Sequence, residues 1–163
     1  MSLNRIIAIF SAILFLIILV IAFQFAGKIS QRFGYHPQPT LPTGKVIIKD
    51  NTFTVEIATS SAEQQKGLSD RSSLDDNKGM LFLFDHPQFV NFWMKNMHFP
   101  IDIIFINDNT IVSIAENAPA PKSDKDTLPL YSPEAPANKV LEINAGLSKK
   151  YKLQKGDKVE ISQ

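Results

Sequence analysis

The feature that most constrains this chain is an uncharged apolar run from Ile6 to Gly27 (IIAIFSAILFLIILVIAFQFAG), which spans 22 residues. At a rise of about 1.5 Å per residue this run forms a helix roughly 33 Å long, and the hydrocarbon core of a bilayer is about 30 Å thick. The sequence therefore predicts a single transmembrane anchor within residues 1–27. The alternative is a cleaved signal peptide, which has a shorter apolar part and ends in a small-x-small site; residues 20–22 (VIA) match such a site best. Both interpretations target the chain to a membrane.

The charges around the apolar run do not set its orientation. Arg5 precedes the run and Lys28 and Arg32 follow it, so the count of positive charges is ambiguous and leans toward a cytoplasmic domain. An N-terminal anchor directly before a folded domain most often exports that domain. We therefore expect a single-pass membrane protein whose domain is extracytoplasmic, in the periplasm or at the cell surface.

A proline-rich spacer separates the run from the rest of the chain. Residues 28–44 (KISQRFGYHPQPTLPTG) are typical of an extended, semi-rigid tether, and residues 45–163 form the domain proper. The domain holds 14 Lys and Arg residues against 16 Asp and Glu residues, which gives a formal charge of −2. This balance argues against nucleic acid or anionic lipid as its main partner. The absence of cysteine excludes disulfides, thiolate metal sites and a cysteine nucleophile.

Alternating apolar residues and turn residues divide the domain into short strands. These strands are expected at residues 46–48, 53–57, 79–84, 89–95, 101–108, 110–117, 139–146 and 157–162. A short helix is expected at residues 61–67, capped by Ser60 or Ser61 and closed by Gly67, and a helical turn in residues 147–153. The loop over residues 118–138 contains five prolines and has the length of a binding or disordered segment. The pattern predicts a mainly β, β-rich α+β domain: a compact antiparallel sandwich or jelly-roll-like barrel with one or two short helices.

Several motifs of the domain resemble the motif series of the DUF192 family. They are GLSDR (67–71), GMLFLF (79–84), FWMKNMHFPIDIIFI (92–106), the glutamate of IAENAPA (114–120), YSPEAPANKVLEINAG (131–146) and KGDKV (155–159). They occur in the family's order and cover nearly all of residues 45–161. The resemblance implies a compact, mainly β fold like a jelly-roll sandwich, often on exported or membrane-anchored proteins, and it implies no activity. Met97-His98 departs from the threonine and small apolar residue expected after Asn96.

Within residues 91–108, Lys95, Asn96 and Asp102 stand among apolar residues. If residues 90–95 and 101–106 pair as a hairpin, the loop between them brings Lys95 close to Asp102. One interpretation is an ion pair between these two residues, with Asn96 capping the turn. The other is a polar pocket beside Trp93, whose apolar walls and convergent polar groups hold a small ligand.

Arg71 follows the short helix and has two interpretations. It can pair with Asp70, Asp75 or Asp76. Its planar guanidinium also suits bidentate binding of a ligand carboxylate or phosphate. In the family that the chain resembles, this arginine recurs after the glycine-leucine pair, so it can instead face the tryptophan segment; both interpretations stay open.

Glu116 and Glu142 each interrupt an apolar strand. A pair of carboxyl groups can divide acid and base roles in glycoside hydrolysis, and the alternative is that each forms a salt bridge or another non-catalytic contact. Tyr131 and Ser132 close the long loop and either cover one mouth of the domain or anchor the loop.

The sequence offers no metal or cofactor motif. His36 lies in the tether, and His86 and His98 lack paired ligand spacing. Asp124 and Asp126 lack the glycine and distal glutamate of a calcium loop. We therefore expect no metal and no cofactor. Five phenylalanines are interpreted as core residues: Phe82, Phe84, Phe89, Phe92 and Phe105.

Three functions remain open. The preferred hypothesis is a non-catalytic, membrane-tethered binding module for a small ligand or an envelope polymer. It assigns no catalytic residue and places the ligand near Arg71, Trp93, Lys95, Asn96 and Asp102, with Glu116, Tyr131, Ser132 and Glu142 as further candidates. The second hypothesis is a hydrolase of envelope carbohydrate that uses two of Asp102, Glu116 and Glu142. The third is a structural domain of a membrane complex.

Overall fold

The computed structural model describes residues 13–24, 40–123 and 126–162. The chain divides into two compact units, Met1–Thr40 and Leu41–Gln163. In the first unit, residues 13–24 form a helix whose large apolar side chains are all exposed. Within the described residues, no helix combines the length and apolar character needed to cross a membrane. The predicted anchor extends over residues outside the described part, as does most of the tether, so both stay predictions.

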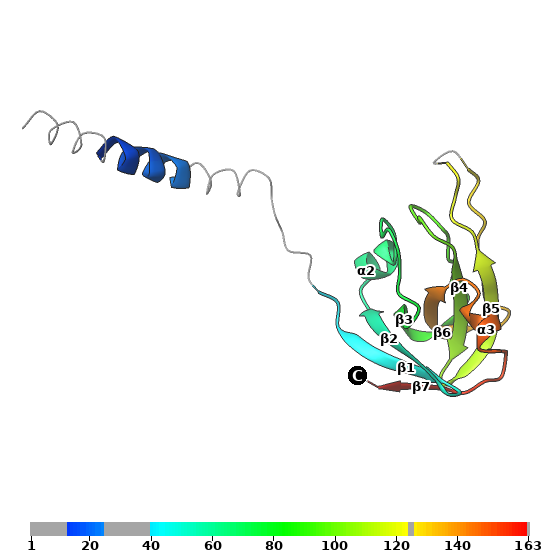
Figure 1. Ribbon diagram of the computed structural model, residues 1–163. Helices are drawn as coiled ribbons and strands as arrows, with labels where there is room; N and C mark the ends of the chain where they lie inside the picture. Colours follow the sequence, from blue (N-terminus) through cyan, green and yellow to red (C-terminus); the bar gives the residue numbers. More distant parts are fainter. Residues whose placement is uncertain (1–12, 25–39, 124–125, 163) are drawn as a thin grey trace, which may run out of the picture. The chain divides into compact units, whose positions relative to one another are not determined.

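The second unit contains seven strands and two short helices among its described residues (Figure 1). In chain order they are β1 (Thr43–Ile48), β2 (Asn51–Ala58), α2 (Ser61–Lys66), β3 (Lys78–Gln88), β4 (Ile101–Asn107), β5 (Thr110–Ala118), β6 (Ala137–Asn144), α3 (Leu147–Lys150) and β7 (Val159–Ser162).

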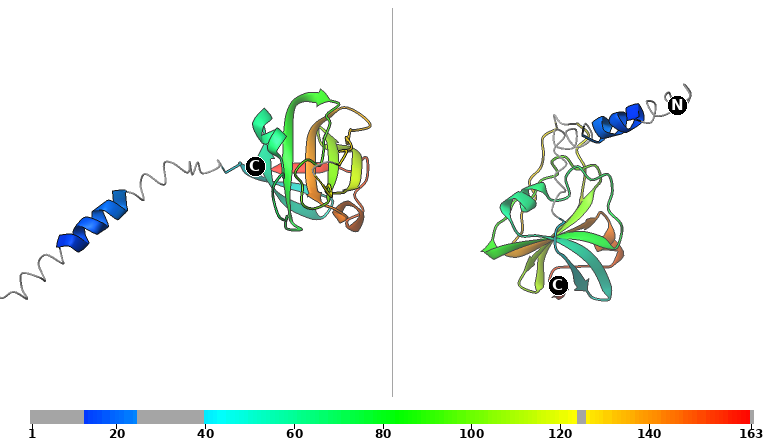
Figure 2. Two further views of the ribbon diagram at one scale, coloured as in Figure 1. Left: turned by 90° about the horizontal axis from the view of Figure 1, so that it is seen from above. Right: turned by 90° about the vertical axis from the view of Figure 1, so that its left-hand side faces the viewer.

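The strands form one sheet in the order β5-β4-β6-β3-β2-β1-β7. The described strand pairs are antiparallel except β2 and β3, which are parallel because the segment with α2 returns the chain between them. The two ends of the sheet meet where Thr110 of β5 pairs with Lys158, just before β7. There the amide of Ile111 donates to the carbonyl of Asp157 at 3.0 Å. Figure 2 shows the resulting half-barrel, in which one sheet curls on itself.

The curled sheet buries apolar side chains on both faces. The inner cluster joins residues from both ends of the sheet, so it fills the inside of the curl; its members include Val46, Ile48, Phe53, Ile104, Ile111, Leu141 and Val159. The outer cluster lies on the other face and includes Met80, Phe82, Ile103, Phe105 and Val140. Leu68, Val90, Met94 and Met97 cover this outer face. They come from the end of the α2 segment and from residues 89–100, between β3 and β4.

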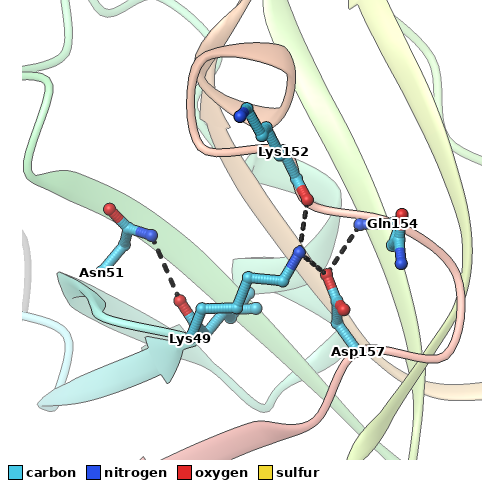
Figure 3. Close-up of polar contacts among 6 residues, drawn as sticks. Lys49, Asn51, Lys152, Gln154 and Asp157 are labelled. Carbon is cyan, nitrogen blue, oxygen red and sulfur yellow. Dashed lines mark hydrogen bonds and ion pairs between the residues drawn. The ribbon is translucent and has the colours of Figure 1, made fainter.

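A polar contact fastens the C-terminal segment to the hairpin of β1 and β2 (Figure 3). The Nζ of Lys49, in the hairpin turn, lies 2.9 Å from an Asp157 carboxylate oxygen and donates to the Lys152 carbonyl at 2.5 Å. The same carboxylate accepts the amide of Gln154 at 2.8 Å. This contact ties the segment before β7 to the turn after β1, and so supports the pairing of β7 with β1.

The mainly β class and both short helices are confirmed, but the arrangement differs from the predicted antiparallel sandwich or jelly-roll-like barrel. The domain has one mixed, curled sheet that forms a half-barrel. The hairpins at 46–57 and 101–117 are confirmed as β1–β2 and β4–β5.

The predicted strand at residues 89–95 is wrong, and so is its hairpin with β4. Only Phe92 of this stretch makes a β-bridge, and its partner is Tyr131. In residues 89–100, Val90, Met94 and Met97 instead pack on the outer face of the sheet. This packing buries the apolar side chains of that face. Asn96 has a positive φ of 56° and turns the chain there, which leaves Lys95 and Asn96 exposed.

Candidate functional site

A cavity of about 380 Å³ opens on the outer face of the sheet, between α2 with its following turn and residues 88–93. Aromatic side chains form most of its apolar wall: Phe82, Phe84, Phe89, Phe92 and Trp93. The polar side chains at the cavity are Gln64, Gln65, Lys66, Ser69, Gln88, Asn91 and Glu142. The combination of an apolar wall and a few polar groups is typical of ligand sites, whose volumes are about 300–1,000 Å³.

The helix α2 is positioned by its own cap and by one contact with the sheet. Ser60 and Glu63 form a capping box, in which the Glu63 amide donates to the Ser60 hydroxyl and the Glu63 carboxylate accepts the Ser60 amide at 2.8 Å. The Gln64 side chain donates to the Leu83 carbonyl of β3 at 2.7 Å. Gly67 ends the helix at φ 50°, a backbone conformation that favours glycine. One wall of the cavity is therefore fixed to its floor.

The opposite wall is fixed by the long loop between β5 and β6. The backbones of Phe92 and Tyr131 exchange two hydrogen bonds, of 2.9 and 2.8 Å, and Ser132 donates to the side-chain oxygen of Asn91 at 2.6 Å. The ring of Phe92 packs edge-on against Phe82 and Phe105, with centroids 5.0 and 6.1 Å away. Tyr131 and Ser132 therefore anchor the loop and the cavity wall.

Glu142 forms part of the cavity floor. It lies on β6 opposite Met80 of β3 and Ile103 of β4, two members of the outer cluster. The residue is 5% exposed, and its Oε2 is buried with no hydrogen-bond partner among the described residues. Burial raises the pKa of Glu142 to about 8, and the positive charge of Arg71 offsets only part of this effect. Most Glu142 carboxyl groups are therefore protonated at neutral pH.

Trp93 also lines a second hollow of about 350 Å³, which lies next to this cavity. The second hollow is lined by Trp93, Lys95, Asn96, Ser69 and the end of α2. The ammonium of Lys95 lies 5.7 Å from the centroid of the Trp93 ring, within the range of a cation–π contact. The indole is 47% exposed. The structure thus brings together three of the predicted site residues, Trp93, Lys95 and Asn96.

Asp102 lies elsewhere, and the predicted Lys95–Asp102 ion pair is wrong. The Asp102 carboxylate is completely buried and accepts backbone amides of Asn117 at 2.8 Å, Gly146 at 3.1 Å and Ser148 at 2.8 Å. Asn117 has a φ of 58° and lies at a register shift of β5 opposite Asp102. Asp102 therefore ties the bulge of β5 and the start of α3 to β4, which is a structural role.

Arg71 pairs with Glu56 of β2, so the prediction of Asp70, Asp75 or Asp76 as its partner is wrong. Its two terminal nitrogens lie 2.5 and 2.8 Å from the two oxygens of Glu56. This bidentate contact holds the pKa of Glu56 below its usual range. Asp70, whose φ is 64°, turns the chain after α2, and its own carboxylate pairs with a lysine of that helix.

The three candidate catalytic carboxylates do not share one cleft. Ile103, next to Asp102, is the residue opposite Glu142, and successive side chains of a strand point to opposite faces. Asp102 and Glu142 therefore point to opposite faces of the sheet. Glu116 is exposed, in the irregular part of β5. Of the three, only Glu142 lines the cavity, so the arrangement offers one carboxyl group and no acid–base pair.

Sequence reasoning missed much of the cavity wall. It did not find Gln64, Gln88 or Asn91, and it assigned Phe89 to the core although this side chain is 64% exposed. The pair of glutamines in α2, Gln64 and Gln65, was the only signal for this wall, and it is a weak one because polar residues of a surface helix also face solvent. Glu56 as the partner of Arg71 left no signal in the sequence.

The fold and the site define a class of protein: a curled-sheet domain with an aromatic cavity on its outer face. The chain belongs to the DUF192 family, described as "Uncharacterized ACR", whose profile matches residues 44–161. No curated protein matches the chain.

Two solved structures are similar to it. A protein of unknown function from Novosphingobium aromaticivorans DSM 12444 is 38% identical, with a TM-score of 0.66; the match covers 77% of this chain and 89% of that one. A protein from Sinorhizobium meliloti 1021, described provisionally as a transcription regulator, is 32% identical, with a TM-score of 0.67; the match covers 76% of this chain and 96% of that one.

Proposed function

We propose that this DUF192 domain is a non-catalytic binding module that holds a small ligand, or one unit of a cell-envelope polymer, in the cavity beside Trp93. The observation that carries the proposal is that Glu142 lines an aromatic cavity while its buried Oε2 has no hydrogen-bond partner among the described residues. A buried polar atom without a partner destabilises a fold by about 1–3 kcal/mol. A ligand that forms a hydrogen bond with Oε2 of Glu142 offsets this cost. The oxygen then has a partner in the bound state only.

The preassembled walls support the same proposal. Gln64 and Ser132 fix the two sides of the cavity by hydrogen bonds within the domain, so a ligand need not order these segments. A pre-organised site loses less conformational entropy on binding. Phe89 and Trp93 are exposed at the cavity although both are large and apolar, and such exposed apolar surface on a soluble domain often marks a binding site.

The alternative of a carbohydrate hydrolase has less support, because Asp102 and Glu142 point to opposite faces of the sheet. We do not extend the regulator description of the Sinorhizobium protein to this chain, because residues 45–163 have a formal charge of −2 and nucleic-acid binding needs basic surface. A structural domain of a membrane complex is the outcome that remains if no small ligand binds.

We further propose that the module is tethered to a membrane through residues 6–27 and displayed on the extracytoplasmic side. The proposal rests on the 22-residue uncharged run and on the exposed apolar side chains of the helix at 13–24, which an apolar environment would cover. Extraction of the full chain from membranes by detergent, but not by high salt or alkaline carbonate, tests the anchor. Release by carbonate would contradict it.

The binding function can be tested with the protein's own fluorophore, since Trp93 is the single tryptophan of the chain and lines the cavity. The full chain, in a non-ionic detergent without sugar groups, is titrated with neutral sugars, amino sugars, amines, peptidoglycan fragments, nucleotides, carboxylates and divalent ions. We expect at least one of them to change the Trp93 emission in a saturable way. The same ligand should raise the melting temperature. At a ligand concentration one hundred times Kd, the free energy of unfolding should increase by about 2.7 kcal/mol.

A matched pair of variants separates the cavity from the surface. Phe89→Ala removes an exposed side chain of the cavity wall and should weaken binding at least tenfold while the fold is retained. Leu130→Ala removes an equally exposed side chain that does not line the cavity, so binding should be unchanged. If no compound in the panel shifts emission or melting temperature, the small-ligand proposal is overturned and the search moves to protein partners.

A further inference from the structure

We propose that the ligand of this cavity carries a primary ammonium group, which pairs with Glu142 and lies against the aromatic wall formed by Phe89, Phe92 and Trp93. The inference rests on the proposed binding function and names the chemical class of its ligand. It follows from three observations: the carboxyl group in the floor, the aromatic wall beside it, and the neutralised charges around it.

One oxygen of the carboxyl group in the floor has no hydrogen-bond partner among the residues that the structure describes. Glu142 Oε2 is buried and has no hydrogen-bond partner among the described residues, and the residue's strand neighbours are the apolar Met80 and Ile103. An ammonium group supplies both a countercharge and N–H donors, and so satisfies this group better than a hydroxyl or a methyl group does. A primary ammonium fits better than a quaternary one, because it has N–H groups that donate hydrogen bonds to the carboxylate and a quaternary ammonium has none.

The aromatic wall favours the same class of ligand. Aromatic rings attract cations through the negative charge above their faces, and tryptophan does so most strongly. Trp93 already takes the ammonium of Lys95 at 5.7 Å from its ring centroid. Lys95 lines the second hollow and is not among the residues that line the cavity at Glu142.

The charged groups around Glu142 are already paired with one another. Lys66, at the end of α2, lines the cavity and forms an ion pair with Asp70. Arg71 acts on Glu142 through its positive charge, but both terminal nitrogens of its guanidinium bind the carboxylate of Glu56 in β2.

The strands below and the segment opposite add no further charge. β3 and β4 present Met80 and Ile103 beside Glu142, and residues 88–93 line the cavity with amide and apolar side chains only. Among the described lining residues, Glu142 is therefore the one ionisable group without a counter-ion.

Binding of an ammonium to this site is linked to the loss of one proton. With the pKa of Glu142 raised to about 8 by burial, the fraction of ionised carboxylate is about 1/100 at pH 6 and about 1/2 at pH 8. The association constant of a cation should therefore rise about 50-fold between pH 6 and pH 8 and level off above that. A neutral ligand that uses the protonated carboxyl group shows the opposite trend, with affinity constant below pH 8 and falling above it.

The test uses n-butylamine, which is protonated throughout this range, and 1-butanol as its neutral counterpart of similar shape. Both are titrated into the full chain in detergent from pH 6 to pH 9, with Trp93 emission and melting temperature as readouts. We expect saturable binding of butylamine with the 50-fold rise, and binding of 1-butanol at least tenfold weaker at pH 8. Glu142→Gln should reduce butylamine affinity at pH 8.5 at least tenfold and abolish its pH dependence. Because glutamine is close in shape to a protonated glutamate, this variant should fold.

The remaining outcomes distinguish this inference from the proposed function. Glu116→Gln removes an exposed carboxylate outside the cavity and should leave the butylamine titration unchanged. Butanol that binds as well as butylamine, with affinity that falls above pH 8, would overturn the ammonium inference and keep the binding module. Butylamine binding that survives in Glu142→Gln would also overturn it. Failure of both probes, together with failure of the wider ligand panel, would remove the binding function itself.

Discussion

Replacing Glu142 by glutamine should change how the stability of the ligand-free protein depends on pH. The pKa of this carboxyl group is about 8 in the folded state, against an ordinary value of 4.5. Between these values the folded state keeps a proton that the unfolded state has released, so the free energy of unfolding falls as pH rises. The slope is about 1.4 kcal/mol per pH unit where only the unfolded state is ionised.

The magnitude follows from these two pKa values. Below pH 4.5 both states are protonated and the group has no effect, and above pH 8 its full cost is present. Integration from pH 5 to pH 8 gives a loss of about 3.5 kcal/mol in the wild-type protein. Glutamine cannot ionise, so the variant lacks this slope, and its stability relative to the wild type should increase by the same amount across the range.

The assay is urea denaturation at pH 5, 6, 7 and 8, followed by the emission of Trp93, the single tryptophan. Other groups titrate in both proteins, so the difference between variant and wild type isolates Glu142. Glu116→Gln is the matched control, because its carboxylate is exposed, and its curve should run parallel to the wild type. If the curve of Glu142→Gln also ran parallel between pH 5 and pH 8, burial would not be holding a proton on Glu142. The electrostatic description of the cavity would then be refuted.

Two further predictions concern the polar contacts that hold the fold. Asp102→Asn should lower the free energy of unfolding by about 3 kcal/mol, because an amide nitrogen then faces backbone N–H donors in a buried site, whereas the exposed Asp85→Asn should change it by less than about 0.5 kcal/mol. Urea denaturation measures both, and equal stabilities would contradict the structural role of Asp102. The Arg71–Glu56 pair is about one-third exposed, so a double-mutant cycle with Arg71→Met and Glu56→Gln should give a coupling of about 1 kcal/mol that decreases in high salt. A coupling near zero in low salt would show that the bidentate geometry does not stabilise the domain.

The local structure of this domain could be predicted from short-range patterns. The alternation of residues 53–57 and the break between the strands at 101–108 and 110–117 predicted the two hairpins. Ser60 or Ser61 predicted the start of α2, and Gly67 predicted its end. These signals involve neighbouring residues, so the chain carries them regardless of tertiary context. The parallel pairing of β2 and β3 depends on where α2 places the returning chain, and no local pattern encodes that position.

The segment at residues 89–100 shows why its predicted strand was wrong. Its apolar residues satisfy the spacing of a strand, but Val90, Met94 and Met97 bury themselves equally well as a cover for the outer sheet face. Hydrophobic spacing reports which residues are buried and does not report whether their backbone joins a sheet. The turn at Asn96, the bridge at Phe92 and the hydrogen bonds to the long loop then decide the path of the chain.

The same limit applies to the two buried carboxyl groups, which look alike in the sequence. Asp102 and Glu142 each stand between isoleucine or leucine residues in strands buried on both faces. Asp102 meets the amides of Asn117, Gly146 and Ser148, which come from distant parts of the chain, whereas no described residue donates to Oε2 of Glu142. A polar residue in a doubly buried strand thus indicates that a partner is needed. Whether the partner is the protein's own backbone or a ligand depends on the donors that the fold brings within reach. For Glu142, which lines the cavity, no described residue donates a hydrogen bond to Oε2. A ligand should therefore be sought at Glu142 and not at Asp102.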